Sequence, residues 1–373
     1  MFSPKEEAAH KEKHFLPRAI ADRLILEQVH QILPGRALLV LLNSTALAKH
    51  LTNQRPEIDW KIFTFEHFYL TATVNALSED DENANPDTRI ELFCNPDLPD
   101  GEYDTIIMAT DAKSSSELTR DVLQGAANRL KANGRLVVST NNPRDHWLQN
   151  HLKETFGRTT TVKDKDGVCY IARKRTTPAK QKNFDAEFAF RDGETLIPCY
   201  SRPGVFSHRR VDAGARALVR SLDLLQNDPK WVKQPPSRIV EMGCGCGSVA
   251  TAVALRYPDA QVIAVDSHAR AVQATEKTSE INGAENVSTI LTSSGDVPQP
   301  GSHDLFLCNP PYYSDYRISE LFLKAAEESL RIGGRIHLVT KQIEWHHNRL
   351  IEIFANADVH EIGDYHVVTA VAY

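Results

Sequence analysis

Residues 239–248 read Ile-Val-Glu-Met-Gly-Cys-Gly-Cys-Gly-Ser, an apolar run that leads into three glycines at alternate positions. The apolar run predicts a short buried strand, and the Ala-rich stretch 249–255 predicts a helix directly after it. Glycine removes side chains where a backbone must turn sharply and come close to a bound molecule. Glu241 lies near the strand end, at the edge where open α/β sheets bind ligands. The stretch therefore predicts an α/β fold with a ligand-binding loop over residues 243–247.

A second acidic residue follows this loop. Asp266 stands nineteen residues past Gly247, after the apolar run 261–265. A carboxylate at that place can accept hydrogen bonds from both hydroxyls of a ribose. Because the loop continues with Ser248, the dinucleotide pattern G-x-G-x-x-G is not met. The spacing favours S-adenosylmethionine, which has no pyrophosphate to place at a helix end.

Residues 304–312 form the other decisive stretch, an apolar strand that ends in Asn309-Pro310-Pro311-Tyr312. Consecutive prolines stop the strand ladder and fix φ, which holds the Asn309 side chain and the Pro310 carbonyl outward. An exocyclic amine is a poor nucleophile because its lone pair is delocalised. Two such acceptors can hold its two N–H groups and aim the lone pair at a methyl group, while Tyr312 stacks on a planar substrate. We therefore expect N-methyl transfer, with Asn309, Pro310 and Tyr312 as the catalytic residues.

Other candidate residues are less specific. Ser294, in the turn after the third strand of the C-terminal half, could bind the adenine or simply form the turn. Phe206 could cover the methyl donor or pack under a lid, and Asp212 is expected to cap a helix. His346 and His347 are expected at the surface. The predicted cofactor-binding residues are Glu241, Gly243, Gly245, Gly247, Asp266, Ser294, Asn309 and Phe206.

The same pattern occurs twice along the chain. Residues 101–140 and 301–340 align without a gap, with identities such as Asp104/Asp304, and residues 38–45 align with 240–247. Such a long ungapped match indicates an internal duplication of one α/β domain.

The two copies differ where ligands would bind. The alignment places Leu39, Leu41, Asn43 and Thr45 opposite Glu241, Gly243, Gly245 and Gly247, and it places Ala109-Thr110-Asp111-Ala112 opposite Asn309-Pro310-Pro311-Tyr312. Only the acid is retained, as Glu66 opposite Asp266. A loop without glycines cannot bring its backbone against a cofactor. The first domain is therefore expected to be catalytically silent.

Hydrophobic periodicity and turn residues predict the elements around these motifs. In the first copy we expect helices at 17–33, 44–51, 116–131 and 145–156, strands at 37–42, 60–65, 103–109, 134–140, 159–162 and 168–172, an acidic loop at 78–88, and a glycine C-cap before 134–140. In the second we expect a hairpin at 187–190 and 195–200 and a helix at 212–225.

These elements divide the chain into a degenerate domain over residues 1–175, a polar basic linker over 176–183, and a catalytic domain over 184–373. Residues 184–237 precede the second glycine loop and have no partner of equal length in the first copy. We expect this addition to form a lid over the site.

Composition restricts the class of protein. The 373 residues are 41% hydrophobic and 25% charged, enough for two domains with full cores. No apolar run could span a membrane, and no secretory signal precedes the first helix. The six cysteines form no spaced framework, so we expect reduced thiols in a cytoplasmic protein. Cys244 and Cys246 lack a second ligand pair, so no metal is expected.

The net charge of −6 excludes a protein that binds nucleic acid over its whole surface. RNA contacts would come from local basic segments. One is Arg173-Lys174-Arg175 with Lys180 and Lys182, and the other is Arg202 with residues 208–210. Each alone also fits a solvated linker or a helix entry.

The whole chain resembles the tandem-domain bacterial ribosomal RNA guanine-N2 methyltransferases, a family with small-subunit and large-subunit members. The resemblance rests on the duplicated layout, Pro203-Gly204-Val205-Phe206-Ser207, Asp212-x-Gly214, Glu241-x-Gly243-x-Gly245-x-Gly247 and Asn309-Pro310-Pro311. It implies a class I methyltransferase fold in each half, with a seven-stranded, mostly parallel, Rossmann-like sheet. It also implies a silent half that supports folding and substrate RNA binding, and a monomer acting on ribosomal RNA or a ribosomal subunit.

Three other functions stay open at this point. Asn-Pro-Pro-Tyr equally suits a protein glutamine N5-methyltransferase, although that function would not explain the duplicated domain. An adenine-N6 nucleic-acid methyltransferase would differ only in its base pocket. A non-catalytic RNA-binding assembly factor could retain the cofactor fold, but the intact second site argues against it.

Overall fold

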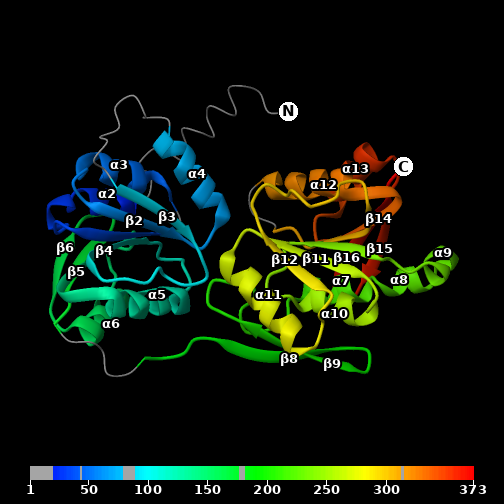
Figure 1. Cartoon of the computed structure of the whole chain (residues 1–373), viewed down its shortest axis with the longest axis horizontal. Coiled ribbons are helices and arrows are strands. Elements are labelled where there is room, and N and C mark those ends of the chain that lie inside the picture. Colours follow the sequence, from blue (N-terminus) through cyan, green and yellow to red (C-terminus); the bar gives the residue numbers. More distant parts are fainter. Residues whose placement is uncertain (1–19, 43, 79–88, 176–180, 312–314) are drawn as a thin grey trace. The chain divides into compact units, whose positions relative to one another are not determined.

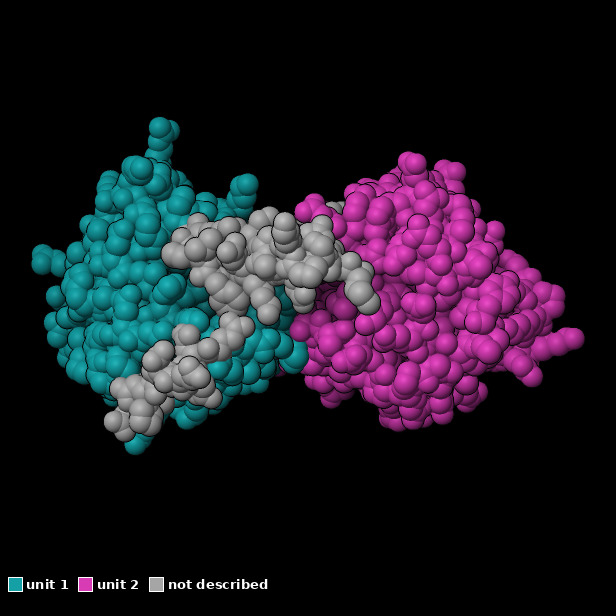
Figure 2. Space-filling view, turned by 90° about the horizontal axis from the view of Figure 1, so that it is seen from above, with its two compact units in different colours: residues 1–184 teal, residues 185–373 magenta. Residues whose placement is uncertain are grey.

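The computed structural model describes residues 20–42, 44–78, 89–175, 181–311 and 315–373. The chain divides into two compact units, residues 1–184 and residues 185–373, which Figure 2 colours separately. Within the described residues, no helix is both long and apolar enough to cross a membrane.

Unit 1 is a seven-stranded sheet with the order β3-β2-β1-β4-β5-β7-β6. Strand β7 runs antiparallel to its neighbours β5 and β6, and the other pairs are parallel. Its elements are α2 (Ile20–Leu26), η1 (Val29–Gln31), β1 (Arg36–Leu41), α3 (Ala46–Gln54), β2 (Asp59–Thr64), α4 (His67–Ser78), β3 (Arg89–Cys94), β4 (Tyr103–Thr110), α5 (Ser116–Arg129), β5 (Leu130–Thr140), α6 (Trp147–Phe156), β6 (Thr159–Lys163) and β7 (Val168–Arg173).

Unit 2 repeats this order as β12-β11-β10-β13-β14-β16-β15, with β16 antiparallel to β14 and β15, and adds the hairpin β8–β9. Its elements are β8 (Ala186–Asp192), β9 (Thr195–Ser201), α7 (Ala213–Arg220), α8 (Asp223–Gln226), α9 (Pro229–Lys233), β10 (Arg238–Met242), α10 (Ser248–Arg256), β11 (Gln261–Asp266), α11 (Ala269–Ile281), β12 (Val287–Leu291), β13 (His303–Cys308), α12 (Arg317–Ser329), β14 (Leu330–Thr340), α13 (Ile343–Phe354), β15 (Asp358–Ile362) and β16 (Tyr365–Val371).

Each sheet is covered by helices on both faces (Figure 1). In unit 1, α2 and α3 pack on one face and α5 and α6 on the other. In unit 2, α7 and α10 cover the first face and α12 and α13 the second. Side chains alternate between these faces along each central strand, as Ile239 and Val240 do on β10. The observed architecture confirms the expected tandem α/β fold.

The strand registers of the two units are also equivalent. Leu39 pairs with Ile107 in unit 1, and Glu241 pairs with Leu307 in unit 2. These are the partners that the sequence alignment predicts, with shifts of 202 and 200 residues. Even the irregularity between Tyr103 and Thr105 recurs between His303 and Leu305.

The register corrects one prediction about the silent copy. Asp266 is the last residue of β11, and the last residue of β2 is Thr64. The Thr64 hydroxyl accepts from the Glu66 amide at 3.1 Å, just as Asp266 Oδ1 accepts from the His268 amide at 2.9 Å. Glu66 therefore corresponds to His268, and unit 1 has lost the acid as well as the glycines.

Two predicted helices are shorter than expected. Within the described residues, the helix expected over 17–33 is α2 followed by the 3-10 turn η1. The helix expected over 212–225 ends at Arg220, after which the backbone changes to i→i−3 bonds, such as that from the Leu222 amide to the Val219 carbonyl at 3.2 Å. A separate helix, α8, then begins at Asp223.

The expected glycine C-cap before the fifth strand was wrong. Helix α5 ends at Arg129 and β5 begins at Leu130, so Gly134 lies inside the strand. The residue with left-handed backbone is Asn133, with φ of 67°. Helix α4 and strand β3 were not among the predicted elements. Most of the acidic loop expected at 78–88 lies outside the described residues.

Part of the segment that precedes the second glycine loop has a counterpart in unit 1. Helix α7 packs on β14 and β16, and α2 packs on β5 and β7, the equivalent strands. Among the described residues, the hairpin β8–β9 and the short helices α8 and α9 remain without a counterpart. The hairpin packs on α11, where the Tyr200 amide donates to the Thr278 hydroxyl at 3.0 Å.

Candidate active site

The glycine loop connects β10 to α10 and is hydrogen-bonded to the carboxyl end of β11. The amides of Gly243 and Cys244 both donate to the Val265 carbonyl, at 2.8 and 3.0 Å. The Gly245 amide donates to Asp266 Oδ2 at 2.9 Å. These bonds fix the loop at the sheet edge where open α/β proteins bind ligands.

The three loop glycines serve different purposes. Gly243, Gly245 and Gly247 have φ values of 84°, 55° and 76°, in the left-handed region that other residues adopt at a cost. A Cβ on Gly247 would lie 2.6 Å from the Cα of Thr275, and one on Gly243 would lie 3.2 Å from the Phe322 ring. A Cβ on Gly245 would meet nothing within 4 Å. Gly247 is thus required by packing against α11, whereas Gly245 faces open space.

Glu241 is a buried acid at this edge. Glu241 is only 3% exposed, and its Oε2 has no hydrogen-bond partner among the described residues. Burial raises its pKa well above the usual 4.5, because the charged form is desolvated. A buried carboxyl oxygen without a partner is costly in the free protein, and a cationic or N–H-bearing ligand would satisfy it.

Asp266 is half-buried and already binds two backbone amides. Oδ1 accepts from His268 and Oδ2 from Gly245, each at 2.9 Å. Burial raises its pKa, and these backbone hydrogen bonds oppose that shift. Because each carboxylate oxygen has two lone pairs, both oxygens can still accept a ligand hydroxyl.

Asn309 lies at the same edge, immediately after β13. The last residue of that strand, Cys308, pairs with Met242 directly before the glycine loop, so the two predicted motifs come together. Asn309 Nδ2 donates to Asp212 Oδ2 at 3.1 Å. Its amide oxygen accepts no hydrogen bond from the residues that the structure describes. Pro310 is buried beside it, and Tyr312 lies outside the described residues.

Phe206 is held outward from the protein. Phe206 is 69% exposed, whereas the adjacent Val205 packs with Cys246 in a small buried cluster. The Pro203 carbonyl accepts from Arg270 Nη1 at 2.8 Å, which anchors the segment to α11. The exposed ring is available to a ligand, and a role for Phe206 in covering the methyl donor stays a prediction.

Ser294 stands in the turn after β12, which is the strand next to β11. The residue is exposed, and its hydroxyl donates to Asp296 Oδ2 at 2.6 Å and contacts the Thr292 hydroxyl at 2.8 Å. The side chain thus closes its own turn. A role in adenine binding stays a prediction.

His346 is not the surface residue that was expected. It is 1% exposed, and its Nδ1 lies 3.0 Å from the Thr340 hydroxyl while Nε2 lies 3.2 Å from the Ser319 hydroxyl. Desolvation lowers its pKa, so it is a neutral packing residue. Trp345 stacks on Tyr316 beside it, with ring centroids 4.1 Å apart.

The residues of the two basic segments are not all accessible to solvent. Lys174 is buried, and its Nζ donates to the Leu130 carbonyl at 2.6 Å, so it holds β5 and β7 together and is unavailable to RNA. Arg173 and Arg175 on either side are exposed. In unit 2, residues 209 and 210 are exposed near Phe206 in the chain.

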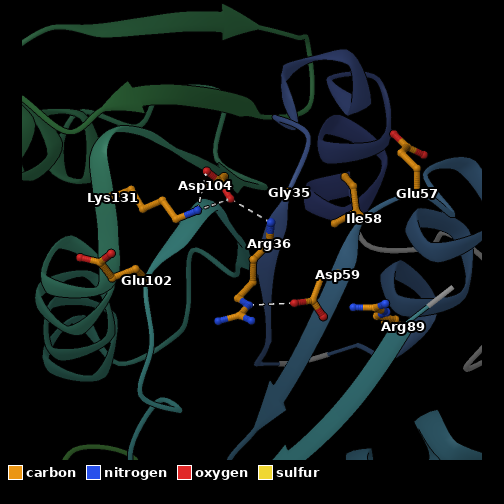
Figure 3. Close-up of a pocket in the computed structure, with 9 residues that line it drawn as sticks. All are labelled: Gly35, Arg36, Glu57, Ile58, Asp59, Arg89, Glu102, Asp104 and Lys131. Carbon is orange, nitrogen blue, oxygen red and sulfur yellow. Dashed lines mark hydrogen bonds and ion pairs between the residues drawn. The ribbon is translucent and has the colours of Figure 1, made fainter. Parts of the chain in front are cut away.

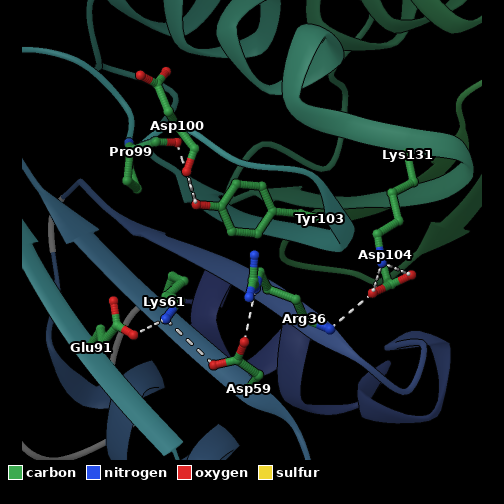
Figure 4. A network of polar contacts seen from close by, with 9 residues as sticks. All are labelled: Arg36, Asp59, Lys61, Glu91, Pro99, Asp100, Tyr103, Asp104 and Lys131. Carbon is green, nitrogen blue, oxygen red and sulfur yellow. Dashed lines mark hydrogen bonds and ion pairs between the residues drawn. The ribbon is translucent and has the colours of Figure 1, made fainter.

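A cavity of about 760 Å³ lies in unit 1 at the amino ends of the strands (Figure 3). Its lining includes the bases Arg36, Arg89 and Lys131 and the acids Glu57, Asp59, Glu102 and Asp104. Several of these groups bind one another in the network of Figure 4, such as Arg36 with Asp59 at 2.8 Å and Lys131 with Asp104 at 2.8 Å. Because open α/β sheets bind ligands at the opposite edge, we assign this cavity a structural role.

The part of this network around Asp104 recurs in unit 2, which supports that assignment. Asp304 accepts from the Arg238 amide at 2.9 Å and from Arg331 Nε at 2.6 Å. These partners correspond to Arg36 and Lys131 around Asp104. The identity of Asp104 and Asp304 therefore reflects strand anchoring and not a binding site.

Comparisons with known proteins agree with the position of this site. Residues 197–369 match the family model of the methyltransferase small domain. The chain is 38% identical over 41% of its length to "Ribosomal RNA small subunit methyltransferase C" of Pseudomonas entomophila, covering 43% of that protein. It is 28% identical over 72% of its length to the protein of the same name in Pseudomonas putida, covering 78% of it. The match to the first relative thus spans less than half of that protein's length.

One solved structure matches nearly the whole chain. It is a 16S rRNA N2 methyltransferase of T. thermophilus in complex with AdoMet and guanosine, with a TM-score of 0.76 and 18% identity. The match covers 95% of this chain and 92% of that one. At this identity the likeness establishes the tandem fold of the whole chain.

Proposed function

Because residues 197–369 form a methyltransferase small domain, we propose that the chain is an S-adenosylmethionine-dependent methyltransferase of ribosomal RNA. The acceptor is the exocyclic N2 amine of a guanine, in the small subunit. The observation that carries the proposal is the position of Asn309 at the end of the strand beside the glycine loop, with an amide oxygen that accepts no hydrogen bond from the described residues. The names of the relatives and of the matched structure support the choice of nucleic acid and base.

The residues at this edge fit the proposed cofactor. The unsatisfied oxygen of Glu241 would bind the cationic methionine part, and Asp266 would accept from the ribose hydroxyls. Gly245 leaves room for close backbone approach. Phe206 and Ser294 would contact the donor and its adenine. When bound, S-adenosylmethionine supplies an electrophilic methyl group on a sulfonium.

The protein's own contribution to the reaction is mainly positioning. The Asn309 oxygen and the Pro310 carbonyl would accept the two N–H groups of the guanine amine, which leaves its lone pair directed away from both. Tyr312 would stack on the base. Such orientation can lower a barrier by several kcal/mol, roughly 7–11 in the best intramolecular cases, without a strong general base.

Unit 1 would support folding and bind substrate RNA without a catalytic site of its own. The exposed Arg173 and Arg175 are candidate contacts in this unit. In unit 2, residues 184–237 would form the lid, and the exposed Phe206 with residues 209 and 210 would meet the RNA. With a ribosomal substrate, the enzyme would act in the cytoplasm.

Replacing Asn309 with Ala tests the proposal. We expect methyl transfer to ribosomal RNA from a strain lacking this protein to fall at least 10³-fold, about 4 kcal/mol. The dissociation constant for S-adenosylmethionine, measured by calorimetry, should change less than threefold. Ala109→Asn in unit 1 is the matched control and should change neither quantity.

Two results would contradict the proposal. Unchanged turnover in Asn309→Ala would remove the mechanism. Full activity on a release factor, with none on ribosomal RNA, would favour the glutamine N5 reaction instead. Mass mapping of the methylated nucleotide separates guanine N2 from adenine N6.

A further inference from the structure

Asp212 forms a contact that its expected role as a helix cap does not require. Its Oδ2 accepts from the amides of Gly214 at 2.8 Å and Ala215 at 3.3 Å, which confirms the cap on α7. The same oxygen accepts from Asn309 Nδ2 at 3.1 Å. This contact joins residues 97 positions apart in the chain.

The chemistry of this contact determines which way the Asn309 amide points. An ionised carboxylate can only accept hydrogen bonds, whereas an amide end carries one donor and one acceptor group. The NH₂ group of Asn309 must therefore face Asp212, and the carbonyl oxygen must face the other way. A flipped amide would place two acceptors against each other at Asp212.

We propose that Asp212 is a positioning residue that holds the Asn309 amide oxygen toward the substrate amine. This inference rests on the proposed function, because it assigns the orientation of the catalytic Asn309. In the opposite orientation, the NH₂ group of Asn309 would face the N–H groups of the substrate. Donor would then meet donor, and the amine would lose one of its two acceptors.

Gly214 provides the space for this arrangement. A Cβ at this position would lie 3.1 Å from Nδ2 and 3.2 Å from Oδ1 of Asn309, and 2.7 Å from Asp212 Oδ2. Its backbone is helical, so left-handed geometry does not explain the glycine. A side chain there would press on both members of the pair, and we infer that the Asp-x-Gly sequence serves the Asn309 amide as well as the helix.

A double-mutant cycle tests the inference. The variants are Asp212→Ala, Asn309→Ala and the double variant, with S-adenosylmethionine affinity, single-turnover methyl transfer and melting temperature measured for each. We expect Asp212→Ala to lower kcat at least tenfold with the cofactor dissociation constant changed less than threefold. In the Asn309→Ala background, Asp212→Ala should lower the residual rate no further, because Asp212 acts through Asn309.

Two further variants separate positioning from capping. Asp228 caps α9 through the Lys230 amide at 2.9 Å, and it also pairs with Arg335. Asp228→Ala should therefore lower the melting temperature at least as much as Asp212→Ala and leave kcat unchanged. Asp212→Asn retains a side-chain oxygen that can cap the helix and accept from Asn309, and should recover most of the rate.

The outcomes are distinct. Additive losses of rate in the double variant, or equal effects of Asp212→Ala and Asp228→Ala on kcat, would overturn the positioning role and leave the proposed function in place. An Asn309→Ala variant with normal turnover would instead overturn the proposed function itself. Loss of cofactor binding in Asp212→Ala would also contradict the inference, since Asp212 would then act on the donor.

Discussion

Units 1 and 2 have the same strand order, and their equivalent strands pair in the same register, yet they differ at the carboxyl ends of the central strands. At the amino ends, both retain an aspartate that anchors the first strand, Asp104 and Asp304. At the carboxyl ends, unit 2 has Glu241 where unit 1 has the fully buried Leu39. The comparison shows that the fold depends on residues at one edge of the sheet and the proposed chemistry on residues at the other.

The equivalent edge of unit 1 is nearly filled. The space between the ends of β1 and β4 is about 40 Å³, lined in part by Ala21, Leu41 and Ala109. That volume holds only a few water molecules. Thr64 at the end of β2 also lacks the carboxylate that Asp266 provides. Asp22, Thr110 and Asp111 also line this space, so unit 1 differs from unit 2 by the small volume at this edge and by the missing counterparts of Glu241 and Asp266.

The largest effect on cofactor affinity is expected from Gly247, the glycine that packs against α11. Gly247→Val would require a left-handed backbone for a branched residue and would put its Cβ within 2.6 Å of the Thr275 backbone. We expect S-adenosylmethionine affinity to fall more than 100-fold, about 2.7 kcal/mol, as measured by calorimetry. Thr45→Gly, the matched change in unit 1, should leave the binding stoichiometry at one. A stoichiometry of two would show that unit 1 can also bind the cofactor and would contradict the difference between the units.

A smaller effect on cofactor affinity is expected from the buried acid Glu241. Glu241→Gln should weaken cofactor binding about tenfold, or 1.4 kcal/mol, because a neutral amide replaces the carboxylate opposite the cation. The same change should raise the melting temperature of the free protein at neutral pH. The Glu241 pKa in the folded state is raised above the usual 4.5 by burial, so folding binds a proton and the free protein loses stability as pH rises above that value.

The difference in melting temperature between Glu241→Gln and the original protein should accordingly grow from pH 4.5 toward neutrality. Leu39→Glu in unit 1 is the converse change. It should destabilise the protein without adding a binding site, because no ligand there would satisfy the acid. Increased cofactor affinity in Glu241→Gln would show that Glu241 does not face the cationic part of the donor.

The smallest effect on cofactor affinity is expected from His337, which acts on the acid sensitivity of folding instead. His337 is fully buried in β14, and burial lowers its pKa to about 3, whereas the aligned residue of unit 1 is Val137. The unfolded chain takes up a proton near pH 6.5 and the folded one does not, so this part of the stability is present above pH 6.5 and is lost as pH falls. His337→Val should reduce the loss of unfolding free energy between pH 7 and pH 5 by about 2 kcal/mol. If denaturant titrations show the same pH dependence of the unfolding free energy with and without His337→Val, the lowered pKa of His337 is contradicted.

Most of the architecture could be predicted from hydrophobic periodicity and the repeat. The hairpin β8–β9, the central strands and the difference between the two loops were all expected, because each depends on local pattern. The break after Arg220 could not be predicted, since helical spacing does not reveal where the backbone changes to i→i−3 bonds. The equivalence of Thr64 and Asp266 was missed because an ungapped alignment does not locate the strand end.

The sequence by itself determined that an acid, three glycines and an Asn-Pro-Pro motif lie at the ends of strands in one copy of a repeated domain. Local periodicity and turn chemistry suffice for that inference. Only the tertiary structure decided what the side chains contact: that Gly247 is required by α11, that Lys174 is buried, and that Asp212 faces Asn309 across 97 residues. Such contacts depend on where separate strands and helices come together in space, and no spacing along the chain encodes them.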